Sequence, residues 1–225
     1  MQHVVIAQCI SQGERLAFTS HSGHGDRLVG HVGWSEVEIA GDDAMVIEGM
    51  EAGGHIGKQT TMALMENVLP NVKSIPVLVA GGISDGRALA AALVMGADGV
   101  QMGSRFLLTT ECPAHPAAKE AIIKATDTDS VATGYSRNLG VRCLANAFTD
   151  LYTAKEISGV PNEELMALGT GTNRRGIMDG DTEKGTVMVG QSLNVLNDIL
   201  PCKDVIERII AEAKEAIERI KNIEF

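Results

Sequence analysis

The sequence predicts an α/β fold of parallel strands joined by helices, and within that class a part of an eight-stranded β/α barrel. Residues 76–82 and 99–106 are short apolar runs of the kind that forms buried strands, and each contains a turn of small residues. Between them, residues 84–96 have polar N-cap candidates, an Ala- and Leu-rich body and a closing glycine, as expected of a helix. Such a strand–helix–strand unit connects parallel strands.

The turns at Gly81-Gly82 and Gly103-Ser104 are the first candidate site. Absent or short side chains let backbone N–H groups approach an anion, and barrel folds often hold a phosphate on the loops after their last two strands. A single Gly-Gly pair is better explained by an ordinary tight turn. Two such turns at the same end of consecutive strands favour a phosphate-binding site.

Composition narrows the functional classes. The 225 residues are 44% apolar and 21% charged, which is ordinary for a globular protein with one sizeable core. A net charge of −10 argues against a general nucleic-acid or anionic-membrane surface. No apolar stretch is long enough to span a bilayer and no signal peptide is visible, so a cytoplasmic location is expected. The four scattered cysteines suggest neither a zinc site nor a disulfide framework.

Residues 1–40 form an atypical segment that is hard to interpret. Residues 3–10 could be a strand, but the Gly, Ser, His and Arg mixture that follows has no regular period. His21, His24 and His31 invite a metal-site interpretation, but their spacing matches no zinc pattern, and a surface loop is expected instead. No metal site is therefore predicted.

Residues 43–49 predict another buried strand, and a helix should run from Thr60-Thr61 to Leu69. The loop between them, residues 50–57, surrounds His55 with three glycines. An imidazole so placed could sit close to a planar ligand and exchange a proton with it, or it could hydrogen-bond its own loop. Because this loop should open onto the barrel face that carries the two glycine turns, we favour the functional role. Glu48 and Glu51 flank the loop and could orient a ligand or stay solvated.

The rest of the chain predicts helices joined by glycine-rich loops. Residues 41–125 are expected to form the barrel part, and residues 126–225 a mainly helical segment that contributes to the site. Residues 185–192 are a further small-residue stretch, and residues 203–222 form a helix with one apolar stripe. That stripe should pack on the body of the domain or on another subunit.

Five motifs in order resemble one known family. They are residues 48–57 (EGMEAGGHIG), 79–87 (VAGGISDGR), 99–106 (GVQMGSRF), 140–146 (GVRCLAN) and 185–191 (GTVMVGQ). They look like the flavin-dependent enoyl-acyl carrier protein reductase II and nitronate monooxygenase superfamily, and the likeness runs from about Gly41 to the C-terminus. The resemblance implies an FMN-binding TIM-type (β/α)8 barrel, with its last three strands here and a C-terminal helical segment.

The resemblance also implies roles for individual residues. It places His55 beside the reactive ring as the catalytic residue. It implies FMN binding by residues of both turns, the preceding loop and the 185–192 stretch, namely Glu48, Gly53, Gly54, Ala80, Gly81, Gly82, Gln101, Met102, Gly103, Ser104, Met188 and Gln191. The implied reaction is reduction of a trans-2-enoyl thioester on acyl carrier protein, with NADH or NADPH as co-substrate.

Two alternatives stay open. The family's other branch oxidises alkyl nitronates with FMN and oxygen, but the Ile56-Gly57 pair after the histidine and the segment from Leu168 to Gln191 favour the reductase. The chain could also be a non-catalytic partial-barrel subunit, since the 40 residues before Gly41 cannot supply five more strands at ~30 residues per strand–helix–strand unit. We therefore expect a homodimer or a partner chain that completes the barrel, with a small-molecule or carrier-bound substrate.

Overall fold

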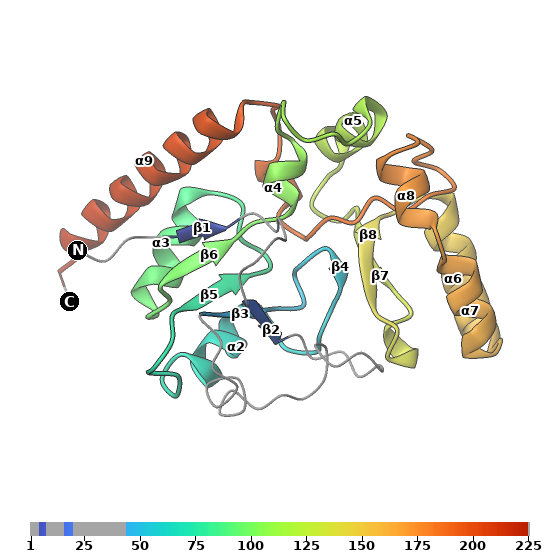
Figure 1. Ribbon diagram of the computed structural model, residues 1–225, viewed down its shortest axis with the longest axis horizontal. Helices are drawn as coiled ribbons and strands as arrows, with labels where there is room; N and C mark the ends of the chain where they lie inside the picture. The colour runs from blue at the N-terminus through green and yellow to red at the C-terminus, as the bar shows by residue number, and fades with distance from the viewer. Residues whose placement is uncertain (1–4, 8–15, 20–43, 225) are drawn as a thin grey trace.

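The computed structural model describes residues 5–7, 16–19 and 44–224, and its main sheet is entirely parallel (Figure 1). Five strands lie in the order β1-β6-β5-β3-β2. Their bounds are β1 (Val5–Ala7), β2 (Leu16–Thr19), β3 (Ala44–Glu48), β5 (Val77–Ala80) and β6 (Gly99–Gln101). From β2 to β6 the sheet follows chain order, and β1 pairs with β6 as the first strand of a barrel pairs with the last.

The sheet corrects the expectation of three strands. The strand expected in residues 3–10 is confirmed as β1, whereas β2 was not predicted at all. Strand β2 runs beside β3 over four residue pairs, a partnership that its local pattern does not reveal. The candidate metal ligands His21, His24 and His31 lie outside the described residues.

Two helices beside the sheet pack closely on each other. They are α3 (Gly86–Val94), which connects β5 to β6, and the long α9 (Cys202–Lys221) (Figure 1). A Cβ on Gly86 would overlap the carbonyl oxygen of Ile209, so the glycine permits this approach. Glu212 accepts a hydrogen bond of 2.9 Å from the Gly86 N–H and Asp85 accepts one of 2.9 Å from Ala88. The helix predicted between β5 and β6 is thus confirmed. The C-terminal helix predicted from its apolar stripe is also confirmed, and it packs on the body of the domain.

Residues 99–106 were expected to form one strand, but they form a short strand followed by the start of a helix. Strand β6 ends at Gln101, and the short helix α4 (Ser104–Leu107) begins two residues later. The Gly103 carbonyl accepts hydrogen bonds from Phe106 and Leu107 at 3.0 and 3.2 Å, because Gly103 has a right-handed helical conformation. Met102 and Phe106 are apolar and buried, as residues of a buried strand would also be, and this is why the pattern suggested a longer strand.

The region expected to be mainly helical also contains a sheet. Strands β7 (Ser130–Thr133) and β8 (Val141–Leu144) form an antiparallel hairpin across the 3-10 helix η1 (Tyr135–Arg137), and β4 (Gly54–His55) adds to β8. Buried Arg142 ties this small sheet to the loop after β3, because its guanidinium donates to Met50 O at 3.0 Å and to Ser130 O at 3.1 Å.

The remaining elements frame the sheets. They are α2 (Thr61–Val68), α5 (Pro116–Lys124), α6 (Ala147–Ser158), α7 (Asn162–Gly169), α8 (Thr172–Ile177) and the 3-10 helix η2 (Leu193–Val195). Asn146 and Thr149 form a capping box that starts α6. Within the described part of the chain, no helix combines the length and apolar character that a bilayer crossing requires.

Candidate functional site

A cavity of about 310 Å³ lies at the carboxyl ends of β3, β5 and β6. This is the end at which parallel α/β sheets bind ligands. Its described lining combines the two glycine turns with the 49–53 loop and the 185–192 stretch, and consists of Glu48, Ala52, Gly53, Ala80, Gly81, Gly82, Ile83, Ser84, Gln101, Met102, Gly103, Ser104, Leu107, Cys112, Met188, Gly190 and Ser192.

The first turn, at Gly81 and Gly82, has a backbone that favours glycine. Both residues have positive φ values, +90° and +72°. A Cβ on Gly81 would also lie 2.7 Å from the carbonyl oxygen of Gly49, which is too close for another residue. Ser192 donates a hydrogen bond of 2.8 Å to the Gly82 carbonyl and so ties the turn to the C-terminal stretch.

The second turn, at Gly103 and Ser104, is the beginning of α4. Gly103 has a φ of −95°, and a Cβ placed on it would meet no atom of the described residues within 4 Å. The Ser104 hydroxyl oxygen accepts a hydrogen bond of 2.9 Å from the Gly190 N–H. The hydroxyl hydrogen is therefore available to donate to another acceptor.

Two polar side chains complete the cavity wall. Burial at the end of β3 raises the pKa of Glu48 from 4.5 to about 7, so its carboxyl group titrates near neutral pH. The Oε1 atom of Gln101, at the end of β6, is buried without a hydrogen-bond partner in the described part of the chain. A buried acceptor of this kind is costly unless a ligand or water satisfies it, so the cavity can bind a hydrogen-bond donor.

The 49–53 loop is held closely against the C-terminal stretch. A Cβ on Gly53 would lie 2.6 Å from backbone atoms of Val189, so only glycine lets the two chains approach this far. The Gln191 N–H donates to the Glu51 carbonyl at 2.9 Å. These contacts place residues 185–192 beside the sheet although 130 or more positions separate them from the loop.

Ten of the thirteen predicted site residues line the cavity, and Gly54, His55 and Gln191 do not. Strand β4 alternates a buried Gly54 with an exposed His55, so the imidazole points away from the covered side of its strand. Gln191 is exposed, whereas its neighbours Gly190 and Ser192 both line the cavity. The catalytic role of His55 remains a prediction.

Several lining residues were not predicted. Ser192 and Gly190 belong to a small-residue stretch that the sequence indicated without assigning contacts, so composition alone could have suggested them. Cys112 lies five residues after α4 and also lines the cavity. No local signal marked it, because α4 turns the chain back toward the site.

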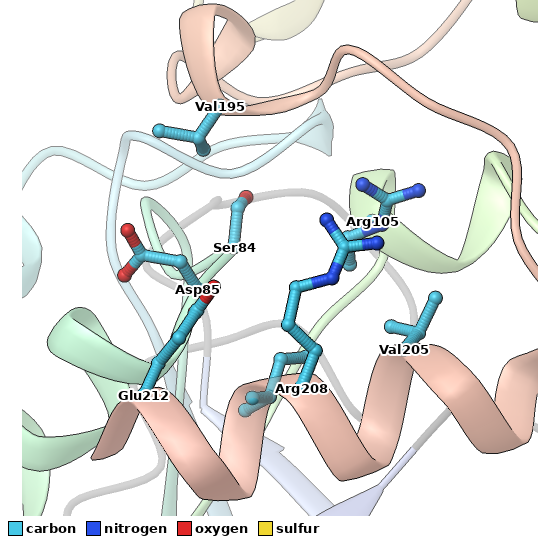
Figure 2. A pocket seen from close by; sticks show the side chains of 8 residues that line it. Ser84, Asp85, Arg105, Val195, Val205, Arg208 and Glu212 are labelled. Atoms are coloured by element: carbon cyan, nitrogen blue, oxygen red, sulfur yellow. The ribbon is translucent and has the colours of Figure 1, made fainter. Parts of the chain in front are cut away.

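A second cavity, of about 30 Å³, adjoins the first at Ser84, which lines both (Figure 2). Figure 2 shows Arg105 and Arg208 extending toward each other, with Asp85 and Glu212 on the opposite side. Buried Arg105 pairs with Asp198 at 3.0 Å and donates to the Asp198 and Leu108 carbonyls at 2.6 and 3.0 Å. This volume suits about one water molecule, so we assign the cavity a packing role behind α4.

No group of three or more His, Cys, Asp or Glu residues within the described ranges is arranged to hold a metal ion. The described lining of the main cavity combines glycine backbone, one carboxyl group, a few neutral polar side chains and several apolar ones.

Comparison with known proteins identifies the family. The family model described as nitronate monooxygenase matches residues 33–212. The chain belongs to the nitronate monooxygenase family. A probable nitronate monooxygenase of Staphylococcus aureus is 34% identical over 191 residues, covering 80% of this chain and 53% of the relative. A Mycobacterium tuberculosis relative, named as a dehydrogenase of a hydroxy-methyl-oxo-octahydroindene-carboxyl-CoA, is 34% identical over 219 residues, covering 79% of this chain and 61% of its own length.

Solved structures of relatives share the fold. FabK from Thermotoga maritima superposes with a TM-score of 0.82 at 38% identity, covering 92% of this chain and 63% of that one. A nitroalkane oxidase from Streptomyces ansochromogenes superposes with a TM-score of 0.71 at 27% identity, over 91% and 58% of the two chains. The α/β class is thus confirmed. The chain spans between 51% and 61% of the length of the first curated relatives.

Proposed function

We propose that the cavity holds FMN, with the phosphate on the two glycine turns, and that the chain is part of an FMN-dependent oxidoreductase. The observation that carries this proposal is the meeting of both turns in one cavity at the carboxyl ends of adjacent strands. The site also fits the group chemically, because the glycines give an anion access to the backbone and Gln101 Oε1 can accept from a flavin N–H or a ribityl hydroxyl.

Bound FMN would supply hydride or electron transfer, and the chain's own residues would position it and manage charge. Ser104 can donate its hydroxyl hydrogen to the phosphate while Gly190 fixes the hydroxyl oxygen. Glu48 can donate a hydrogen bond when protonated and only accept when ionised, and its pKa of about 7 makes both forms available. Met188 adds an apolar contact to the cavity wall.

For the reaction, we propose reduction of a trans-2-enoyl thioester at the expense of NADH or NADPH. Two observations support a thioester substrate. FabK is more similar to this chain than the nitroalkane oxidase is, at 38% against 27% identity. The Mycobacterium tuberculosis relative carries a CoA thioester in its name. In this proposal His55 delivers the proton to the substrate, from the strand that follows the cavity-lining Gly53.

Oxidation of an alkyl nitronate is the second candidate. The family model and the Staphylococcus aureus relatives carry that name, so this reaction has its own support among the relatives. Both candidate reactions use the same FMN site. They differ in the substrate that reacts at the flavin ring, an enoyl thioester or an alkyl nitronate.

The test begins with flavin binding by the full 225-residue chain. We expect the chain to bind FMN in stoichiometric amount, and a chain that cannot be reconstituted with FMN would overturn the proposal. The holoprotein is then assayed for NADH and NADPH oxidation with crotonyl thioester, and for oxygen consumption with a nitronate. Turnover of the nitronate alone would select the second candidate. FMN binding without either turnover would indicate a partial-barrel subunit, and a search for a second chain or copy would follow.

A further inference from the structure

Thr61, the first residue of α2, joins three parts of the chain. Its N–H donates to both carboxylate oxygens of Glu51, at 3.0 and 2.9 Å. Its hydroxyl group lies 3.0 Å from Glu51 Oε2 and 2.9 Å from the carbonyl oxygen of Gly81. Thr61 is only 7% exposed, and these bonds are partly buried. Glu51 and Thr61 therefore link the 49–53 loop, helix α2 and the first glycine turn.

Glu51 and Thr61 lie so close to Gly49 and Gly82 that these two positions have little or no room for a side chain. A Cβ on Gly49 would overlap the Thr61 hydroxyl oxygen and backbone, and a Cβ on Gly82 would lie 3.2 Å from the Glu51 Cβ. Glu51 thus braces the turn twice, through Thr61 at Gly81 and by direct packing at Gly82. Neither Glu51 nor Thr61 belongs to the lining of the main cavity. Any effect of the pair on a ligand must pass through the turn.

Hydrogen-bond chemistry distinguishes the two side chains. The Thr61 hydroxyl has one hydrogen, while Glu51 Oε2 as a carboxylate and the Gly81 carbonyl both only accept, so that hydrogen is shared between them. A glutamine at position 51 could accept from the Thr61 N–H through its oxygen and donate to the Thr61 hydroxyl through its nitrogen. The threonine hydrogen would then serve Gly81 alone. The brace consequently needs the hydroxyl of residue 61 and a hydrogen-bonding group at 51, but no negative charge.

A plain helix cap is the competing explanation. The N-cap residue Thr60 makes no side-chain cap bond, and the Glu51 carboxylate takes over that role for α2. Capping explains the bonds to the Thr61 N–H. It does not explain the bond from the hydroxyl to Gly81, which lies 20 positions away in the turn that borders the cavity.

We propose that Glu51 and Thr61 are positioning residues that hold the Gly81 and Gly82 turn in the conformation that accepts the FMN phosphate. This inference rests on the proposed function. It adds that Glu51 and Thr61 affect binding of the phosphate group of FMN rather than of the flavin ring. Because the proposed function places the FMN phosphate on this turn, loss of the bond from Thr61 to Gly81 should weaken binding of FMN but not of riboflavin, which has the same ring and no phosphate.

The test compares FMN with riboflavin by fluorescence titration of the full chain and its variants. We expect Thr61→Val and Thr61→Ala to weaken FMN binding about tenfold, as loss of one well-placed hydrogen bond can do, and to change riboflavin binding less than about twofold. Thr61→Ser and Glu51→Gln should keep FMN binding within about threefold of the parent. Thr170→Val removes a 2.9 Å hydroxyl bond to Met166 away from the cavity and is the matched control.

Circular dichroism establishes which variants fold, and Thr61→Ala carries the test if the bulkier valine does not. If the variants bind FMN and riboflavin equally more weakly, Glu51 and Thr61 act only as a helix cap and the proposal is overturned. If FMN binding is unchanged, the two residues do not position the turn, and the proposal is overturned as well. If the parent chain prefers FMN over riboflavin and the Thr61 variants keep that preference, this inference alone is overturned. If the parent chain binds neither flavin, the proposed function fails as well.

Discussion

The turn at Gly81 and Gly82 and the turn at Gly103 and Ser104 follow neighbouring strands, yet the chain holds them differently. The first has two positive φ values and is braced by Thr61, Ser192 and the packing of Glu51. The second has a helical backbone and, among the described residues, open space at Gly103 and one side-chain bond, from Gly190 to Ser104. Two similar small-residue signals thus encode a rigid turn required by backbone geometry and an open one suited to ligand access.

The largest expected change in stability comes from a substitution in the turn at Gly81 and Gly82. Gly81→Ala forces a Cβ into a left-handed backbone and to within 2.7 Å of the Gly49 carbonyl oxygen. Strain and overlap together should lower the free energy of unfolding by about 4 kcal/mol. Urea denaturation followed by circular dichroism measures this loss. A midpoint equal to that of the parent would show that the turn is less constrained than its geometry indicates.

A smaller effect concerns the carboxyl group beside the rigid turn, since Glu48 lies opposite Ala80 in the sheet. Its pKa is raised from 4.5 to about 7, so the folded chain binds more protons than the unfolded chain between these values. The stability of the ligand-free chain should therefore fall as pH rises through this window. Removing the charge by Glu48→Gln should stabilise the chain at pH 8 by about 2 kcal/mol, allowing for partial solvation.

The gain from Glu48→Gln should shrink as the pH falls and disappear at about pH 4, below the unfolded pKa of 4.5, where the parent carboxyl is protonated in both the folded and the unfolded chain. Denaturation at both pH values gives the comparison. The exposed Glu66→Gln, on α2, is the matched control, because it makes the same substitution outside the cavity. A gain that is the same at both pH values would contradict the assigned pKa.

The smallest expected change in stability tests the open turn. Gly103→Ala adds a methyl group where the described residues leave space and where the backbone suits any residue. The free energy of unfolding should stay within about 0.5 kcal/mol of the parent. Because Gly103 lines the cavity, FMN binding should weaken at this unchanged stability. A strongly destabilised variant would show that the two turns are alike after all.

Local signals were sufficient for the strand–helix–strand unit. Strand β5, helix α3 and strand β6 follow from apolar runs, the Asp85 cap and the glycines, all within about one structural unit of sequence. The set of ten lining residues was given by the resemblance to the family and not by these local signals. The local signals overestimated β6 because buried residues of a short helix and of a strand look alike when only apolar character is counted.

Long-range partners were beyond such signals. Strand β4 has two residues and exists because β8, more than 80 positions away, pairs with it. That pairing turns His55 outward, which local sequence could not show. Cys112 joins the cavity through the turn made by α4, and Ser192 through its bond to Gly82.

The sequence by itself determined the α/β character, the parallel unit at residues 76–101 and the two small-residue turns, because caps, periodicity and glycine act within a few positions of each other. Only the tertiary structure decided that Glu51 and Thr61 brace one turn while the other stays open, and that residues 185–192 close the cavity wall. Those outcomes depend on hydrogen bonds and close packing between distant segments, which form only after the sheet has brought them together.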